Sequence, residues 1–386
     1  MERERLLRLR LHSHGLAEPH TAGPAAVVAR MGAVQAQLYE SGKWTIGART
    51  GCTRQDVDDT IAAGAIVRTW MMRGTLHFVP PADVRWMLAL LTPPIIAGSA
   101  SRVRQLELDD GQFARAEAAL GRELRQSGLL TRKQALAVLR AEGLSTDGQR
   151  GYALLSRAAQ RGIIAFGPQQ GTQETFVLLD GVAPQGRLWQ REEALVELAR
   201  RYFTSHGPAS VQDFARWSGL TLTDTRKALL ALAGELERDV CEGGDVYFAA
   251  ALPQPQAGAL LLAGFDEYVL GYRDRSPVLD REHDGDVVPG NNGMFQPTIV
   301  LDGRVAGTWK AAECRGATTV EALPFQPLSL EQEQALGRAA ALYGSYLGLP
   351  ARLQIVIFAA NATGCSARKE TCTRCRPTVY PAGGNN

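Results

Sequence analysis

The chain has 386 residues, of which 45% are hydrophobic, and its formal net charge is only +2. This length suits two to four modules around a sizeable core, and no apolar run approaches the roughly 20 residues of a membrane span. The small net charge excludes a chain that is basic throughout, so a surface for an anionic partner must be a local patch. The amino-terminal residues lack the apolar core of a signal peptide, and six scattered cysteines make no disulfide framework. We therefore expect an ordered cytoplasmic protein with reduced thiols and no membrane partner.

The amino-terminal part carries a loose copy of a unit that recurs twice further along the chain. We predict a helix from about residue 25 and a second helix over 53–63. Two strands, 66–70 and 75–79, should then flank the sequence Met72-Arg73-Gly74. Gly74 suits the tight turn between them.

Two clearer copies follow, and each has the order helix, turn, helix, β-hairpin. The first copy has a helix over 131–140, a second helix that ends at about residue 160, and strands at 163–166 and 175–179. The second copy has a helix over 210–217, a second helix that ends at residue 232, and short strands around 239 and at 246–248. Thr131 with Gln134, and Ser210 with Asp213, should cap the first helix of each copy. This order is typical of a helix-turn-helix with a wing.

After Pro253 the sequence changes to short β-rich segments at 259–263, 296–301, 304–309 and 353–358. Asp302-Gly303 between two alternating apolar runs predicts a two-residue hairpin. We expect a small β-barrel or half-barrel here, with a helix over 330–347 packed across it. The polar segment after Ala362 should be flexible.

Gln35 and Gln37, at the end of the first helical run, are the first candidates for chemistry. In an α-helix residues i and i+2 point about 200° apart, so both amides share a side only where the backbone is extended or turning. Gly32 makes such a break credible. Paired amides could hold a water by their oxygens while donating from their nitrogens, which hydrolysis of a glycosidic bond needs. From the residues alone, two surface glutamines near a helix end are the better interpretation.

The stretch 68–77 places Arg68, Arg73 and His77 on a predicted hairpin. This is the composition of a wing that touches phosphate or enters a groove. A hairpin with Trp70 packed in the core fits equally well, and a histidine in this setting is more often structural than catalytic.

The stretch 265–275 follows a buried strand and concentrates acids, tyrosines and arginines. Asp266 and Glu267 could serve acid–base work or bind a metal, and Arg273 with Arg275 could clamp phosphates. A salt-bridged turn that holds the barrel to the winged helices is an equal alternative.

Other catalytic motifs find little support. Cys365, Cys372 and Cys375 have the spacing C-x6-C-x2-C with no fourth ligand after them, so a closed zinc site is incomplete. No Walker loop, dinucleotide fingerprint, H-E-x-x-H or G-x-S-x-G motif is present in the sequence. We expect neither a metal nor another cofactor.

Six stretches together give the sequence a specific resemblance: 34–37, 67–77, 201–208, 265–268, 271–275 and 303–309. Over nearly all of residues 5–360 the chain resembles the winged-helix family of AlkZ-type DNA glycosylases, which excise bulky alkylated bases and some interstrand crosslinks. In that family a glutamine–aliphatic–glutamine motif is the catalytic signature, and it falls here on Gln35 and Gln37. A branch with aspartate at the second position unhooks crosslinks more broadly. Gln37 therefore indicates the narrower branch that acts on antibiotic adducts.

The resemblance implies a monofunctional enzyme that hydrolyses the N-glycosidic bond of purines alkylated at guanine N7 or adenine N3 and leaves an abasic site. Such a base is cationic and leaves easily, so two neutral glutamines could suffice, with no Schiff-base lysine. The enzyme would act as a monomer on double-stranded DNA, in general repair or in self-resistance. The side chains that we assign to DNA contacts are those of Arg49, Arg68, Arg73, His77, Tyr268, Arg273 and Arg275.

The implied fold is of the α+β class, with three tandem winged-helix units plus a C-terminal β-barrel-like domain around a DNA channel. We place the winged-helix units at 1–110, 111–185 and 186–252, the barrel at 253–362 and the tail at 363–386. Two alternatives stay open: a winged-helix regulator that does no chemistry, and a relative that senses lesions without cutting.

Overall fold

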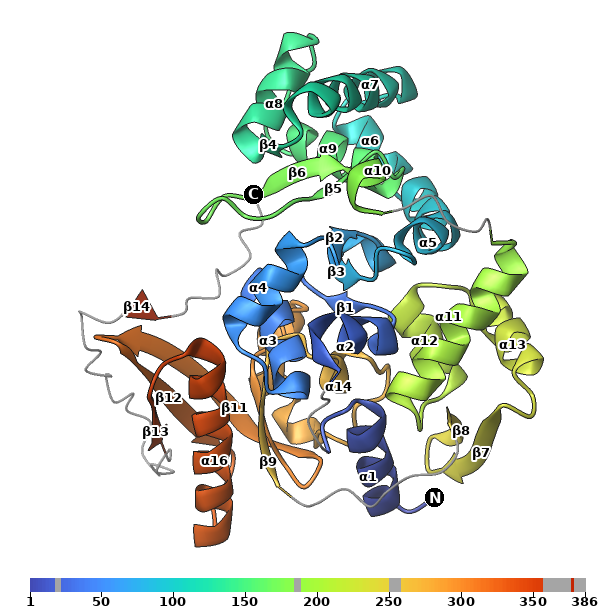
Figure 1. The fold of residues 1–386 in the computed structure, drawn as a ribbon. Helices are drawn as coiled ribbons and strands as arrows, with labels where there is room; N and C mark the ends of the chain where they lie inside the picture. Colours follow the sequence, from blue (N-terminus) through green and yellow to red (C-terminus); the bar gives the residue numbers. More distant parts are fainter. Residues whose placement is uncertain (18–21, 184–188, 250–257, 357–375, 378–386) are drawn as a thin grey trace.

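The computed structural model describes residues 1–17, 22–183, 189–249, 258–356 and 376–377 (Figure 1). The helices of the first half are α1 (Arg3–Ser13), α2 (Gly23–Met31), α3 (Tyr39–Thr50), α4 (Arg54–Ala62), α5 (Val84–Gly98), α6 (Ala100–Gln105), α7 (Asp110–Ser127), α8 (Arg132–Ala141), α9 (Arg150–Gln160) and α10 (Leu179–Val182). Those of the second half are α11 (Arg191–His206), α12 (Val211–Ser218), α13 (Leu222–Ala231), α14 (Glu267–Leu270), α15 (Asp284–Val287) and α16 (Leu330–Leu347). Three short 3-10 turns are η1 (Met72–Gly74), η2 (Arg281–His283) and η3 (Pro289–Asn291).

The strands fall into three sheets. The first comprises β1 (Val34–Gln35), β2 (Val67–Trp70), β3 (Leu76–Val79), β4 (Leu130–Thr131), β5 (Ile164–Phe166) and β6 (Thr175–Leu178). The second is the hairpin of β7 (Leu236–Cys241) and β8 (Gly244–Ala249). The third comprises β9 (Ala259–Leu262), β10 (Thr298–Leu301), β11 (Arg304–Cys314), β12 (Ala317–Pro324), β13 (Ala351–Ile355) and β14 (Arg376–Pro377).

The first sheet joins two hairpins that the sequence placed in separate units. Its order is β1-β3-β2-β5-β6-β4, and the hairpins meet where Arg68 pairs with Phe166. The indole of Trp70 packs on Phe166 at a centroid distance of 4.8 Å, so the junction is apolar on one face. The amino-terminal unit and the α7–α9 unit at the top of Figure 1 therefore share one sheet.

The predicted helix–helix–hairpin order is confirmed in the second and third copies. The helices α8 and α9 precede β5 and β6, and α12 and α13 precede β7 and β8. Thr131 with Gln134 and Ser210 with Asp213 form the two expected capping boxes. Each box satisfies two backbone N–H groups that a helix start leaves unpaired. The division into three winged-helix units stays a prediction.

The helix α3 follows the glutamine motif directly and was not predicted. Its apolar residues are too few to give a clear period, and it carries two glycines. A Cβ at Gly42 would lie 2.9 Å from the Phe78 ring and 3.0 Å from the carbonyl oxygen of Gln35. Glycine is therefore required where this helix approaches the motif.

The carboxy-terminal sheet is open, so the prediction of a closed barrel is wrong. Its order is β13-β12-β11-β10-β9, with β14 beside β11, and its edges β9 and β13 are not paired with each other. The helix α16 carries the chain over to β13, which lies parallel to β12 and so extends the sheet rather than closing it. The hairpin at Asp302-Gly303 is confirmed, because Leu301 pairs with Arg304.

Two predictions fall on residues outside the described part. The cysteine spacing of Cys365, Cys372 and Cys375 lies there, as does the predicted tail apart from Arg376 and Pro377. In the described ranges, no helix is both long enough and apolar enough to cross a membrane. In Figure 1 the α2–α3 region with β1 lies at the centre, between the C-terminal sheet at lower left and α11–α13 at right.

Candidate active site

The glutamine motif lies on an edge strand at the centre of the molecule. The helix α2 ends at Met31, and Gly32, with φ +76°, turns the chain into the extended stretch that contains β1. The expected break is thus confirmed. Gln35 faces His77 across the ladder to β3 and is only 6% exposed, whereas Gln37 lies on the surface.

The two glutamines have different hydrogen bonds. The Oε1 of Gln37 accepts the backbone N–H of Leu76 at 3.2 Å. In a regular antiparallel ladder the backbone carbonyl of Ala36 would accept this N–H group. The carbonyl of Ala36 accepts instead from Nε of Arg68 at 3.0 Å. The Oε1 of Gln35 is buried and accepts no hydrogen bond from the residues that the structure describes. Because a buried polar atom normally has a partner, Gln35 is the amide that is free to hold a reactant.

Glu267 at the start of α14 supports the motif from its free edge. Its Oε1 accepts the backbone N–H of Gln35 at 2.9 Å, and its Oε2 accepts the indole N–H of Trp217 at 3.0 Å. Burial alone would raise the pKa of this carboxyl, but His206, His77 and the Gln35 N–H outweigh burial and lower the pKa. The group is therefore a buried carboxylate, within hydrogen-bond distance of the motif backbone.

Of the two buried histidines near Glu267, His77 is neutral at pH 7. Burial lowers the pKa of His206, although Glu267 acts against that shift. The His206 Nε2 lies 3.7 Å from the Glu267 Oε2, too far for a hydrogen bond. Burial also lowers the pKa of His77 to about 4, and the charge of Arg73 acts in the same direction. The site therefore combines one fixed negative charge with neutral acceptors.

Asp266 and Arg49 form a buried ion pair beside this network. The guanidinium contacts both carboxylate oxygens at 2.8 Å and also donates to the carbonyl of His14 at 2.8 Å. Both side chains are 0% exposed. Removing one partner from such a pair strands a buried charge, so the pair fastens α3 to the stretch before α14. Arg49 has no free face for a phosphate, and our proposed DNA surface leaves it out.

Tyr268 is also buried away from any DNA surface. Its hydroxyl donates to the carbonyl of Gly303 at 2.7 Å, and its side chain lies in the core between α1 and the C-terminal sheet. The residue fixes the β10–β11 turn against α14. We omit it from the proposed DNA contacts for this reason.

The β2–β3 hairpin is packed rather than projecting. Trp70 lies in the core, with its indole N–H donating to the hydroxyl of Tyr152 at 2.9 Å. Arg68 is buried and pairs with Glu174 at 2.9 Å. Arg73, with φ +55°, donates to the carbonyl of Trp217 on α12. The hairpin thus positions α12 and the motif, which matches the packed alternative.

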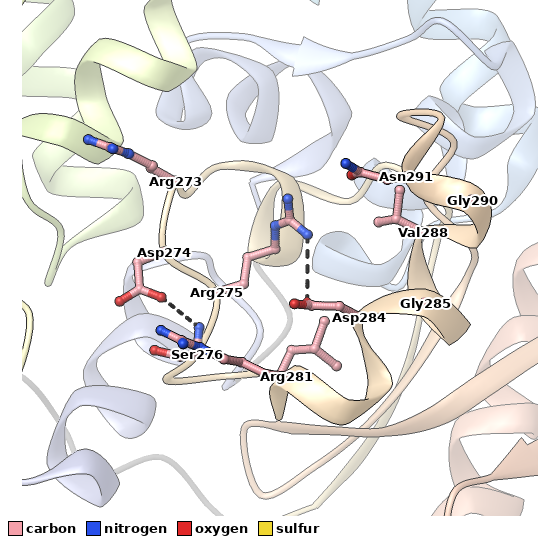
Figure 2. A pocket seen from close by; sticks show the side chains of 11 residues that line it. Arg273, Asp274, Arg275, Ser276, Arg281, Asp284, Gly285, Val288, Gly290 and Asn291 are labelled. Atoms are coloured by element: carbon pink, nitrogen blue, oxygen red, sulfur yellow. Dashed lines mark hydrogen bonds and ion pairs between the residues drawn. The ribbon is translucent and has the colours of Figure 1, made fainter.

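Arg273 and Arg275 line a cavity of about 500 Å³, together with Arg281 (Figure 2). The Nη1 of Arg275 lies 4.0 Å from Asp284 Oδ1, and its Nε is buried without a partner among the described residues. Its Cζ lies 4.9 Å from the ring centroid of Phe295. With one long ion pair, the guanidinium keeps donors for an oxyanion.

The loop that carries these arginines is fastened to α12. The Oδ1 of Asp213 accepts the backbone N–H groups of Arg273 at 2.8 Å and Asp274 at 3.3 Å. Its Oδ2 accepts the N–H and hydroxyl of Ser210 at the helix start. One buried carboxylate therefore caps the helix and sets the backbone of the arginine loop.

Comparison with known proteins identifies the family. A model of the DNA glycosylase AlkZ-like family matches residues 28–346. The chain belongs to the AlkZ-like DNA glycosylases. An interstrand DNA cross-link repair glycosylase of Streptomyces sahachiroi is 29% identical in an alignment of 337 residues that covers 81% of this chain and 90% of that protein. The solved structure of DNA glycosylase AlkZ from the same organism matches with a TM-score of 0.76 and 27% identity, over 92% of this chain and 100% of that one.

The family resemblance that the sequence suggested is therefore confirmed, and this glycosylase is a hydrolase that acts on DNA. Sequence reasoning had weighed Glu267 as an acid or a metal ligand but had not connected it to Gln35, which is 232 positions away. It missed Trp217 and His206 entirely. The sequence signal for this network is that His206 and Glu267 lie in stretches that carry the family resemblance, whereas Trp217 lies outside them.

Proposed function

We propose that this glycosylase hydrolyses the N-glycosidic bond of purines alkylated at guanine N7 or adenine N3, bulky adducts included, and leaves an abasic site. The observation that carries the proposal is the buried Oε1 of Gln35, which has no hydrogen-bond partner in the described part of the chain and lies on an edge strand beside the surface-exposed Gln37. An amide oxygen in this state can hold a water for attack.

The charge distribution suits a cationic leaving group. Alkylation puts a positive charge on the base, so the enzyme must stabilise an oxocarbenium-like sugar rather than force the base out. Two glutamines are neutral, but Glu267 brings a carboxylate to the backbone of Gln35 at 2.9 Å. A fixed charge in a water-poor site acts strongly on a cationic transition state. Undamaged, uncharged bases should therefore react poorly.

We propose that the enzyme has no lyase activity. A lyase forms a Schiff base through an amine that is free of its proton. Lys43, on the helix that follows the motif, is buried and pairs with Glu40 at 2.9 Å and Asp58 at 2.7 Å. These two ion pairs engage the ammonium, so it is not available to attack a sugar. The abasic site should thus be released uncleaved.

We propose that Arg273, Arg275 and Arg281 grip the phosphate backbone, since the three residues line one cavity and Nε of Arg275 has no hydrogen-bond partner among the described residues. A bulky adduct fits poorly in a tight base-flipping pocket, so the enzyme would engage the duplex from the minor groove with the adduct partly in place. A complex with the lesion enclosed in a pocket would contradict this mode. The related Streptomyces protein is named for interstrand crosslink repair, which makes a crosslinked duplex a substrate to test. The pathway served would be base-excision repair or self-resistance.

The deciding experiment is single-turnover base release from duplexes with 7-methylguanine or a bulky N7 adduct. We expect wild type to release both and the Gln35→Ala/Gln37→Ala variant to release neither while it still binds the duplex. Wild-type binding without release of either base would favour a regulator or a lesion sensor. Cleavage of the abasic product at the same time would refute the monofunctional assignment.

A further inference from the structure

Three buried polar side chains form a row on one face of the first sheet. Gln35 on β1 pairs with His77 on β3, and Thr69 on β2 pairs with the same His77. Residues directly opposite in antiparallel strands carry their side chains on the same face. Gln35 is 6% exposed, His77 is 1% exposed and Thr69 is 0% exposed. The imidazole therefore lies between an amide and a hydroxyl, and the amide is on the edge strand.

Both neighbours of the imidazole have unused hydrogen-bonding atoms. Gln35 Oε1 and Thr69 Oγ1 are buried and have no hydrogen-bond partner in the described part of the chain. Two such atoms on one face are unusual, because buried polar atoms are nearly always paired. Their positions on either side of His77 indicate a site for a small hydroxylic molecule.

The tautomer of His77 is set by the strand itself. Its Nδ1 lies 3.1 Å from the carbonyl oxygen of Thr75. A carbonyl only accepts, so Nδ1 carries the hydrogen and Nε2 of the neutral ring is an acceptor. The charged groups that face the ring are Arg73 from the turn and Glu267 from α14. Burial and Arg73 hold its pKa at about 4, so the acceptor is available at pH 7.

Resting on the proposed function, we propose that His77 is a catalytic residue of the glycosylase and takes the proton of the attacking water. Gln35 Oε1 accepts the second water hydrogen, and the Thr69 hydroxyl donates to the water oxygen. The oxygen bonds to C1′ as the C1′–N bond breaks, and the electron pair of that bond neutralises the cationic base. The proton moves to Nε2 of His77 and then to solvent. Glu267 stabilises the imidazolium that forms.

The main test compares His77→Asn with wild type in single-turnover release of 7-methylguanine. Asparagine keeps an N–H near the position of Nδ1 for Thr75 but lacks the Nε2 acceptor. We expect release to slow by about 100- to 10,000-fold, the range for a lost general base, while the Kd for the same duplex is unchanged. Imidazole in the buffer should restore part of the activity of His77→Ala, which a purely structural role would not permit.

Thr69→Val gives a second, gentler test, since at nearly constant shape it removes a hydroxyl that has no partner among the described residues. We expect a release about tenfold slower, equivalent to one hydrogen bond, in a protein at least as stable as wild type. Should the His77 variants fail to fold, this variant decides alone. Wild-type release rates in His77→Asn, or in Thr69→Val in that case, would overturn the inference. An inactive wild type would instead overturn the proposed function.

Discussion

At Glu267 the two carboxylate oxygens each accept an N–H group, one from the Gln35 backbone and one from the Trp217 indole. In Glu267→Gln an amide NH₂ replaces one oxygen, so two donors face each other. We expect the free energy of unfolding at pH 7 to fall by about 1–3 kcal/mol, the cost of an unsatisfied buried group. Urea denaturation of both proteins measures the difference.

The same residue predicts how this difference depends on pH. The folded pKa of Glu267 lies below the ordinary glutamate value of about 4.3. A depressed carboxyl pKa contributes stability that is complete above that value and is lost as pH falls through the folded value. The gap between wild type and variant should therefore shrink below about pH 4. The exposed Glu282→Gln is the control, with a change of at most about 0.5 kcal/mol. A gap that is equal at pH 7 and pH 3 would contradict a charged Glu267.

The carboxylate of Asp213 contacts both the start of α12 and the backbone of the arginine loop, and matched variants can separate these two contacts. Asp213→Ala removes the carboxylate half of the capping box and the support for the backbone of Arg273. Ser210→Ala removes the hydroxyl of the capping box but leaves Asp213 Oδ1 on the loop. Each should destabilise the fold by about 0.5–2 kcal/mol.

Only Asp213→Ala should also weaken DNA binding, by several-fold in Kd, because the loop then loses its fixed backbone. Fluorescence anisotropy with a labelled duplex measures the affinity, and thermal denaturation measures the stability. Equal affinity losses in the two variants would show that the capped helix, and not the loop contact, governs binding.

Elements with local signals were predictable from the sequence, and elements defined by distant partners were not. The capping boxes at Thr131 and Ser210 and the turn at Asp302-Gly303 depend on neighbouring residues, so their patterns are sufficient. The strand β1 is two residues long, and its partner Leu76–Val79 is about 40 positions away. The prediction of a closed barrel was wrong because the composition of the strands does not reveal whether the two edge strands of a sheet, here β9 and β13, pair with each other.

The candidate site shows the same division. Gln35 and Gln37 came from the family resemblance, since their composition alone favoured surface glutamines. Arg49 resembled any other arginine in the sequence, but folding places it against Asp266 at zero exposure. Burial and pairing with residues more than 200 positions away decide which charges are free, and a linear pattern does not contain that information.

Over the whole molecule, the formal charge of +2 gives little general attraction for DNA, so affinity must come from local cations. We attribute it to the cavity arginines, and salt dependence tests this. Each phosphate that a protein neutralises adds about −0.9 to the slope of log K against log salt concentration. The variant Arg273→Ala/Arg275→Ala/Arg281→Ala should therefore bind more weakly and flatten the slope by up to about 2.7, three times that value.

Arg122→Ala on α7 is the matched control, since that arginine is exposed and already pairs with Glu142. Its slope should equal that of wild type. Titrations of an undamaged duplex from about 50 to 200 mM KCl cover the range in which counterion release dominates. Parallel lines for wild type and the triple variant would mean that the DNA backbone lies elsewhere on the glycosylase. A flatter line for the triple variant alone would place the duplex against the loop that Asp213 holds, next to the helix whose Trp217 contacts Glu267.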